Sequence, residues 1–274
     1  MGKLYLCGTP IGNLEDITLR AVRILKEVDI IAAEDTRHTK ILLDRYGIKT
    51  PLTSYHKFNI RAKTGNVIDL IKQGRSVALV SDAGMPGISD PGHELVKGAV
   101  EEGVEVVPIP GPTALIAALA SSGLPTNSFV FEGFLPSGSS ERKKVLSRLK
   151  EEQRTMVFYE APHRINKVIK DMEGVFGSER QCVIGREITK KFEEFKRGNI
   201  GQLVKSLGSS KLKGEFVIVV EGKSFTDERL SGDRVFGLIS DLIRLGISKK
   251  DISRVVSAHS GLNKNQVYDM VLKA

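Results

Sequence analysis

The chain has 274 residues, enough for one large domain or for two or three smaller ones, and a formal charge of +8. No apolar run approaches the roughly eighteen residues of a membrane span, and the first nine residues are too short for a secretory signal, so we expect a soluble, cytoplasmic protein. The two cysteines, Cys7 and Cys182, lie in apolar runs, which argues against a disulfide framework and a cysteine-based zinc site. The positive charge favours an anionic partner such as nucleic acid, although many basic enzymes bind anionic metabolites instead.

Strand-like and helix-like segments alternate through the first 123 residues. Short apolar runs are typical of buried strands, and apolar residues at helical spacing, as in 17–28, are typical of amphipathic helices. This alternation predicts a mainly parallel sheet with helices on both faces. The expected strands are 4–8, 29–33, 51–57, 76–80 and 104–109, and the expected helices are 17–28, 39–46, 60–73, 94–102 and 114–121.

After Gly123 the pattern changes, and strands follow one another with fewer long helices between them. Such a succession predicts antiparallel pairing and a second α/β domain, with a mixed sheet. The expected strands are 129–134, 155–160, 181–188, 193–197 and 215–221, and the expected helices are 141–152, one ending near 176, and 200–207.

A polar linker, 221–228, precedes three short helices expected at 229–245, 249–259 and 263–272, arranged like a helix-turn-helix unit. A packing appendage, an oligomerisation module and a nucleic-acid reader all fit this small basic segment. The sequence therefore predicts three parts: an N-terminal α/β domain with glycine-rich cofactor loops (1–123), a second α/β domain that closes the cleft (124–222), and a helical extension (223–274).

The segment from Ser81 to Gly92, S-D-A-G-M-P-G-I-S-D-P-G, follows an apolar run and precedes a helical pattern. Three glycines and two prolines in twelve residues predict a tight loop at the end of a strand. Ligands of open α/β sheets bind beyond the carboxyl ends of the strands, and a loop of this length is more often functional than a simple turn.

Four polar clusters end predicted strands, two in each half of the chain, which favours a small-molecule site in a cleft between the domains. A simpler interpretation of Asp35 or Thr36 is a helix cap, and His163 is explained equally simply by a capping or surface position. For Arg186, Glu187 and Lys190 the simpler interpretation is a solvated strand edge. The clusters are 34–38, 81–90, 160–164 and 186–190.

The sequence lacks several catalytic signatures. The five histidines show no metal-binding spacing, so we expect no metal, and neither G-x-G-x-x-G, a P-loop nor G-x-S-x-G occurs. The residues by themselves indicate a basic, two-domain α/β protein with an interdomain ligand site, and they do not name its reaction.

Six sequence blocks stand in order along the chain: T-P-I-G-N-L-E-D (9–16), A-E-D-T-R (33–37), the loop 81–92, P-G-P-T-A (110–114), Y-E-A-P-H-R (159–164) and R-E-I-T-K (186–190). Together they resemble the bacterial ribosomal RNA small subunit methyltransferase I family, within the tetrapyrrole methylase-like fold. The resemblance covers roughly 3–222, with the long central block the most specific, and extends less distinctively to the helical tail.

This resemblance implies 2′-O-methylation of a cytidine ribose in 16S ribosomal RNA near the decoding centre, with S-adenosyl-L-methionine as donor. It also implies a homodimer whose substrate is 16S RNA, expected within the 30S subunit. The donor is expected between the domains, against Pro10, Ser81, Asp82, Ala83, Gly84, Ile88, Thr113, Ala114 and Tyr159.

A ribose hydroxyl needs a proton acceptor, and guanidinium groups suit RNA phosphates. The low aromatic content, without tryptophan, disfavours a broad base-stacking platform. The expected base or lysine-assisted network is among Glu34, Asp35, Glu160, Glu187 and Lys190, and the expected RNA contacts are Arg37, His163, Arg164 and Arg186.

Two alternatives stay open at this stage: a methyltransferase for a small tetrapyrrole-like acceptor, and a non-catalytic RNA-binding protein of the same fold. Comparing methyl transfer to 30S particles with transfer to porphyrinoid acceptors tests the first alternative. Calorimetry with the methyl donor tests the second, because a pure binding protein has no affinity for the donor.

Overall fold

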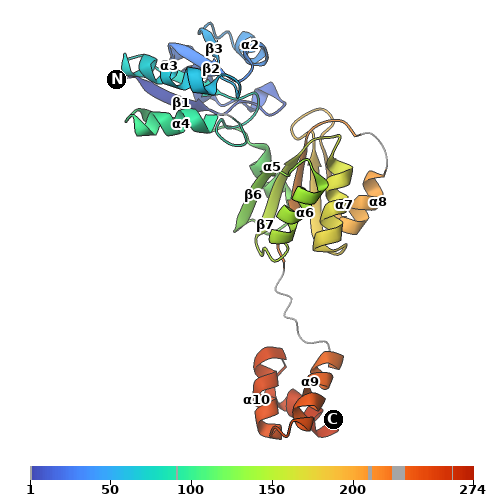
Figure 1. The fold of residues 1–274 in the computed structure, drawn as a ribbon. Coiled ribbons are helices and arrows are strands. Elements are labelled where there is room, and N and C mark those ends of the chain that lie inside the picture. Colours follow the sequence, from blue (N-terminus) through green and yellow to red (C-terminus); the bar gives the residue numbers. More distant parts are fainter. Residues whose placement is uncertain (1, 91, 209–211, 224–231, 261) are drawn as a thin grey trace. The chain divides into compact units, whose positions relative to one another are not determined.

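The computed structural model describes residues 2–90, 92–208, 212–223, 232–260 and 262–274. The chain forms two compact units, Met1–Gly222 and Lys223–Ala274 (Figure 1). Two five-stranded sheets make up the larger unit.

The first sheet is entirely parallel, with strand order β3-β2-β4-β1-β5. All four residues of its central strand β4 are buried, as expected for a strand covered on both faces. Alternate residues enter two cores, one beneath α1 and α2 and the other beneath α3 and α4, so the predicted architecture is confirmed. The elements are β1 (Lys3–Cys7), η1 (Leu14–Asp16), α1 (Leu19–Glu27), β2 (Ile30–Ala33), α2 (Thr36–Arg45), β3 (Leu52–Ser54), α3 (Ile60–Lys72), β4 (Val77–Val80), α4 (Gly92–Glu101) and β5 (Glu105–Ile109).

The second sheet is mixed, with strand order β6-β7-β10-β8-β9, and only β6 and β7 run parallel. Helices α6, α7 and α8 pack on one face, and α5 packs on the other. The predicted boundary at 123 therefore separates α5 from the sheet on which it packs. The elements are α5 (Ala114–Ser122), β6 (Phe129–Phe134), α6 (Ser139–Arg148), β7 (Thr155–Glu160), α7 (Ile165–Phe176), β8 (Gln181–Arg186), β9 (Glu194–Asn199), α8 (Ile200–Leu207) and β10 (Phe216–Val220).

Two element ends differ from the sequence pattern for identifiable reasons. Helix α2 begins at Thr36, three residues early, because the Asp35 carboxylate accepts the Arg37 amide at 2.8 Å and caps the helix. Strand β8 ends at Arg186, two residues early, because Glu187 and Thr189 have left-handed backbones with φ of 50° and 67°.

The described residues of the smaller unit form three helices, α9 (Gly232–Arg244), α10 (Lys249–Ser260) and α11 (Lys264–Lys273). They share a core of branched aliphatic residues contributed by all three helices. The linker predicted at 221–228 and the first residues of the predicted helix 229–245 fall largely outside the described residues. None of the helices in the described segments has the length and apolar character needed to cross a membrane.

Candidate methyl-donor site

The carboxyl ends of the first sheet's strands carry loops that bind one another. The Thr9 amide donates to the Gly84 carbonyl at 2.9 Å, and the Gly84 amide returns the bond to Thr9 at 3.0 Å. The Thr9 hydroxyl donates to the Ser81 carbonyl at 3.0 Å. These bonds join the loop after β1 to the loop after β4, so both present backbone at one edge of the sheet.

The conformation of the loop after β4 depends on the carboxylate of Asp90 and on two glycines. Asp90 Oδ1 accepts the amides of Gly87 at 2.6 Å and Gly92 at 2.9 Å. Gly84 and Gly87 have φ of 83° and 91°, a left-handed backbone that side chains with a Cβ disfavour. The glycines are therefore required by the conformation of the loop.

The loop after β5 approaches the end of β1 so closely that side chains are excluded. A Cβ on Gly8 would lie 2.7 Å from the Gly111 Cα and 2.8 Å from the Met85 sulfur. The loops after β1, β4 and β5 thus converge as bare backbone, which fits a site that surrounds its ligand with peptide groups.

A cavity of about 670 Å³ lies between these loops and the second sheet. This volume falls within the range of roughly 300–1,000 Å³ that is typical of small-molecule sites. Its charged lining is acidic, and among the lining residues that the structure describes none is lysine, arginine or histidine. The lining residues are Ile11, Glu34, Ser81, Ala83, Gly84, Met85, Ile88, Ser89, Asp90, Thr113, Ala114, Leu115, Ile116, Phe131, Phe134, Tyr159, Glu160, Ala161, Pro162, Ile188, Glu215, Phe216 and Val217.

Three aromatic rings from β6 and β7 line the second sheet's side of the cavity. The Tyr159 ring lies 4.9 Å from Phe131 and 5.7 Å from Phe134, centroid to centroid. The Tyr159 hydroxyl accepts the Leu115 amide at 3.1 Å, near the start of α5. Burial raises the pKa of Tyr159, and the hydrogen bond from the Leu115 amide opposes that rise.

Two carboxyl groups of the first sheet's loops line the cavity. Burial, followed by the charge of Asp82, raises the pKa of Glu34. Burial also raises the pKa of Asp90, against the amide hydrogen bonds from Gly87 and Gly92. Both groups hold protons more strongly than exposed carboxyls do.

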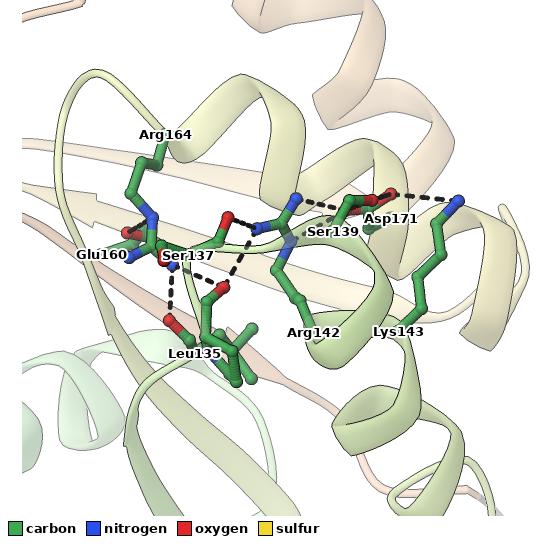
Figure 2. Close-up of polar contacts among 9 residues, drawn as sticks. Leu135, Ser137, Ser139, Arg142, Lys143, Glu160, Arg164 and Asp171 are labelled. Carbon is green, nitrogen blue, oxygen red and sulfur yellow. Dashed lines mark hydrogen bonds and ion pairs between the residues drawn. The ribbon is translucent and has the colours of Figure 1, made fainter.

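On the opposite wall, Glu160 is tied to Arg164 (Figure 2). The Glu160 side chain is 0 % exposed and its Oε1 lies 3.1 Å from Arg164 Nε. The same guanidinium donates to the carbonyls of Leu135 at 2.5 Å and Pro136 at 3.1 Å. Burial raises the pKa of Glu160, and the Ala161 amide and the Arg164 charge oppose that rise. The pair therefore fixes the loop that follows Phe134 in the cavity wall.

A second ion cluster lies beside the cavity. Lys190 Nζ lies 3.0 Å from both Glu187 and Glu215, and Glu187 also accepts the Glu215 amide at 3.0 Å. Burial alone raises the pKa of Glu187, but these hydrogen bonds outweigh it and lower that pKa. The Lys190 stem also covers Gly12, where a Cβ would lie 2.4 Å from Cγ of the lysine. This cluster joins β10 to the loop after β8.

The structure brings nine of the predicted site residues to the cavity wall. These are Glu34, Ser81, Ala83, Gly84, Ile88, Thr113, Ala114, Tyr159 and Glu160. Pro10 is buried beside the lining residue Ile11, and Asp82 lies behind the wall, where its carboxylate accepts the Asp35 amide at 3.0 Å.

The other predicted residues lie outside this lining. Asp35 caps α2 and binds Arg37 at 2.6 Å, and the hydrogen bonds from Arg37 hold the pKa of Asp35 well below its usual range. The Arg37 side chain is 89 % exposed, and His163 is exposed as well. Arg186 donates to the Lys213 carbonyl at 2.8 Å, and Arg164 serves the network of Figure 2. Arg37 and His163 are therefore the most accessible of the four predicted RNA contacts.

Sequence reasoning did not name Asp90, Phe131, Phe134 or the β10 residues as site residues, although Asp90 ends the predicted cluster 81–90. Asp90 stands in the predicted loop, and its S-D-P-G setting was a usable signal. Phe131 and Phe134 are three apart and would point to opposite faces of a regular strand. A bulge after Phe131 shifts the register, so that Phe131 pairs with Val157 and Phe134 with Tyr159, which share a face. The sequence signal for this bulge is Gly133, whose φ is 64°, because a glycine inside a strand pattern often marks a bulge.

Within the described residues, no group of three or more histidine, cysteine or acidic side chains is arranged to hold a metal ion. Both cysteines are buried, as expected, and burial raises the pKa of the Cys7 thiol to about 12.

Comparison with known proteins identifies the family. The tetrapyrrole (corrin/porphyrin) methylase model matches residues 3–204. A relative from Halalkalibacterium halodurans, named ribosomal RNA small subunit methyltransferase I, is 45 % identical over 98 % of this chain and 94 % of its own length. The chain belongs to that family. Predictions of the family and of a methyltransferase are thereby confirmed.

A further relative of the same name, from Thermotoga maritima, is 48 % identical over 81 % of this chain and 100 % of its own length. The match covers 223 residues, which is close to the size of the larger unit.

Solved structures share the fold. Uroporphyrin-III-C-methyltransferase from Thermus thermophilus has a TM-score of 0.56 at 23 % identity, covering 81 % of this chain and 95 % of that one. Diphthine synthase has a TM-score of 0.60 at 15 % identity, covering 81 % and 91 %. The predicted tetrapyrrole methylase-like fold is therefore confirmed.

Proposed function

We propose that the protein uses S-adenosyl-L-methionine to methylate the 2′-hydroxyl of a cytidine ribose in 16S ribosomal RNA near the decoding centre. The names of the relatives support the ribosomal RNA substrate. The acidic and apolar cavity at the convergence of backbone loops is the observation that carries the donor assignment. We further propose a cytoplasmic homodimer that acts on RNA within the 30S subunit.

The cavity fits this donor chemically. When bound, S-adenosyl-L-methionine supplies an electrophilic methyl group on a positively charged sulfur, next to a cationic amino group and an adenosine. Carboxylates suit the positive groups, and aromatic and aliphatic side chains suit the adenine. A cavity wall without described basic side chains disfavours phosphate-bearing cofactors, since these require cationic partners.

The proposed binding residues act in different ways. Gly84 and the loop that carries it present peptide groups, Thr113 and Ala114 form the floor at the start of α5, and the Tyr159 strand closes the opposite side. A wall of this kind holds reactants in line and excludes water, which is the main contribution an enzyme can make to a displacement reaction.

Among the predicted bases, Glu34 has the best position and environment. Its carboxyl lines the cavity, and burial together with the Asp82 charge raises its pKa, which makes it a stronger proton acceptor than an exposed glutamate. Glu160 also lines the cavity but is held by Arg164 and the Ala161 amide. We assign Glu34 as the proton acceptor for the ribose hydroxyl, and Glu160 as a wall residue.

For RNA binding we propose Arg37 and His163 at the exposed edge, with Arg186 and Arg164 supporting the backbone. The Glu187–Lys190–Glu215 cluster then keeps the loop after β8 in place.

Transfer of labelled methyl groups tests this function. The purified protein, tritiated donor and 30S subunits assembled on unmodified 16S transcript should yield label in 2′-O-methylcytidine after nuclease digestion and mass spectrometry. Free 16S transcript and a porphyrinoid acceptor serve as comparison substrates. Label on a base or on the porphyrinoid, or donor binding without any transfer, would contradict the proposal.

A further inference from the structure

Three phenylalanines stand out by their exposure. Phe58, Phe192 and Phe134 are 85, 69 and 56 % exposed, the highest values among the phenylalanines whose side chains the structure describes. Phe134 belongs to the cavity wall, and Phe192 lies on the loop that carries the wall residue Ile188. Phe58 lies on the loop after β3, which leaves the first sheet next to Glu34, since the Tyr55 amide donates to the Ala33 carbonyl at 2.7 Å. Isolated apolar side chains on a surface are ordinary, but here the most exposed rings gather around one site.

Phe58 lies on the loop after β3, at the same edge of the first sheet as Glu34. Asn59 fixes this loop, because its Oδ1 accepts the His56 amide at 2.9 Å. Lys57 Nζ lies 4.9 Å from the centre of the Phe58 ring. Burial raises the pKa of the cavity carboxyl Glu34, and the charge of Lys57 partly opposes that rise. Because Ala33 pairs with Ser54, Glu34 and the loop that carries Lys57 and Phe58 follow neighbouring strand ends, on the first sheet's side of the cavity.

Phe192 lies on the loop between β8 and β9, which belongs to the second sheet. Lys191 Nζ lies 5.7 Å from the centre of its ring. On this loop, Ile188 lines the donor cavity, while Thr189 and Glu193 line a second cavity of about 540 Å³. The two cavities share Ile188, so Phe192 stands beside both.

We propose that Phe58 and Phe192 are two base-stacking contacts for unpaired RNA, one on each side of the cavity, and that Lys57 and Lys191 bind the adjoining phosphates. This inference rests on the proposed function. An exposed ring stacks on a flat base, and a flexible cation beside it binds the adjoining phosphate, so the pair complements the two parts of a nucleotide. Two single rings hold two bases without the broad platform that the aromatic content of 6 % disfavours.

Alanine variants test the contribution of each ring. Stacking on an aromatic side chain contributes enough that Phe58→Ala or Phe192→Ala should weaken 30S binding by about 5- to 150-fold. The KM for 30S subunits should rise accordingly, donor affinity by calorimetry should not change, and Phe58→Tyr and Phe192→Tyr should restore binding. Phe129→Ala is the matched control, because Phe129 is 37 % exposed at the opposite end of β6 and pairs with Thr155.

Fluorescence tests stacking directly, because the chain contains no tryptophan. In Phe58→Trp and Phe192→Trp the single indole should be quenched as 16S transcript saturates the protein. The indole of Phe129→Trp should keep its emission in the same titration.

The outcomes separate this inference from the proposed function. If the wild-type protein methylates no RNA, the proposed function fails. If it methylates 30S subunits while both alanine variants keep their KM, or while both indoles remain unquenched at saturating RNA, only the stacking contacts are refuted.

Discussion

Removal of the Arg164 guanidinium should destabilise the cavity wall in a pH-dependent way. Arg164→Met keeps an unbranched side chain of similar length but leaves Glu160, whose side chain is 0 % exposed, without its ion partner at 3.1 Å. It also removes the donor to the buried Leu135 carbonyl.

The expected loss is large for a single substitution. Breaking a buried ion pair by deleting one partner costs about 3–5 kcal/mol, because the remaining charge is neither solvated nor paired. For a unit of this size, about 2–4 °C of melting temperature corresponds to each kcal/mol, so the midpoint should fall by about 6–20 °C.

The loss should shrink in acid. Without Arg164 the folded-state pKa of Glu160 rises further above its unfolded value. A carboxyl with a raised folded pKa loses stability as the pH rises through that pKa and loses none below the unfolded pKa. The deficit of Arg164→Met should therefore be full at pH 8 and should fall near pH 4 to the pH-independent cost of the unsatisfied Leu135 carbonyl.

Differential scanning calorimetry at several pH values measures this directly. The double variant Glu160→Gln/Arg164→Met should recover stability at pH 8, because the buried charge is gone. Lys143→Met is a control within the same network, since Lys143 is 57 % exposed, lies 3.5 Å from Asp171, and should cost less than about 1 kcal/mol. A deficit below 1 kcal/mol for Arg164→Met, or one that does not change with pH, would refute the reasoning.

Three further predictions concern the cavity and the smaller unit. Glu34→Gln should raise the melting temperature at pH 8 but not at pH 4. Burial and the charge of Asp82 raise the pKa of Glu34 in the folded protein, so its ionisation at pH 8 opposes folding. An equal change in melting temperature at both pH values contradicts this. Gly84→Val should lower donor affinity more than tenfold in calorimetry, because it forces a β-branched residue into a φ of 83° at the cavity wall. The control is Gly103→Val, at a φ of 66° with open space around it, which should lose stability but keep donor binding. A chain of residues 1–222 should bind the donor as the full chain does, because the cavity lies within that unit; a tenfold loss would assign part of the site to the tail.

Much of the fold was predictable because its signals are local. The glycines and prolines of 81–92 indicate a loop, and short apolar runs indicate buried strands such as β4. Helix boundaries moved where a side chain hydrogen-bonds backbone, as Asp35 does at the start of α2. The structure confirms the interpretation of Asp35 as the residue that caps this helix.

The composition of the cavity wall was less predictable because it depends on register and partner choice. The bulge in β6 turns Phe131 and Phe134 to one face. Gly133 in the F-V-F-E-G-F segment signals a bulge, but it does not show which side chains the register shift brings together. Likewise, Arg164 resembles a phosphate contact in sequence, but its guanidinium binds Glu160 and two loop carbonyls. Sequence shows that an arginine is present, whereas only the fold shows which acceptors surround it.

The most direct measurement is a crystal structure of the protein with S-adenosyl-L-homocysteine, the product left after methyl transfer. We predict this ligand in the cavity between the Ser81–Asp90 loop and Tyr159, with peptide groups near Gly84 and Thr113 around it. A product bound elsewhere, or a cavity closed by side chains in crystals grown at saturating product, would contradict the donor assignment.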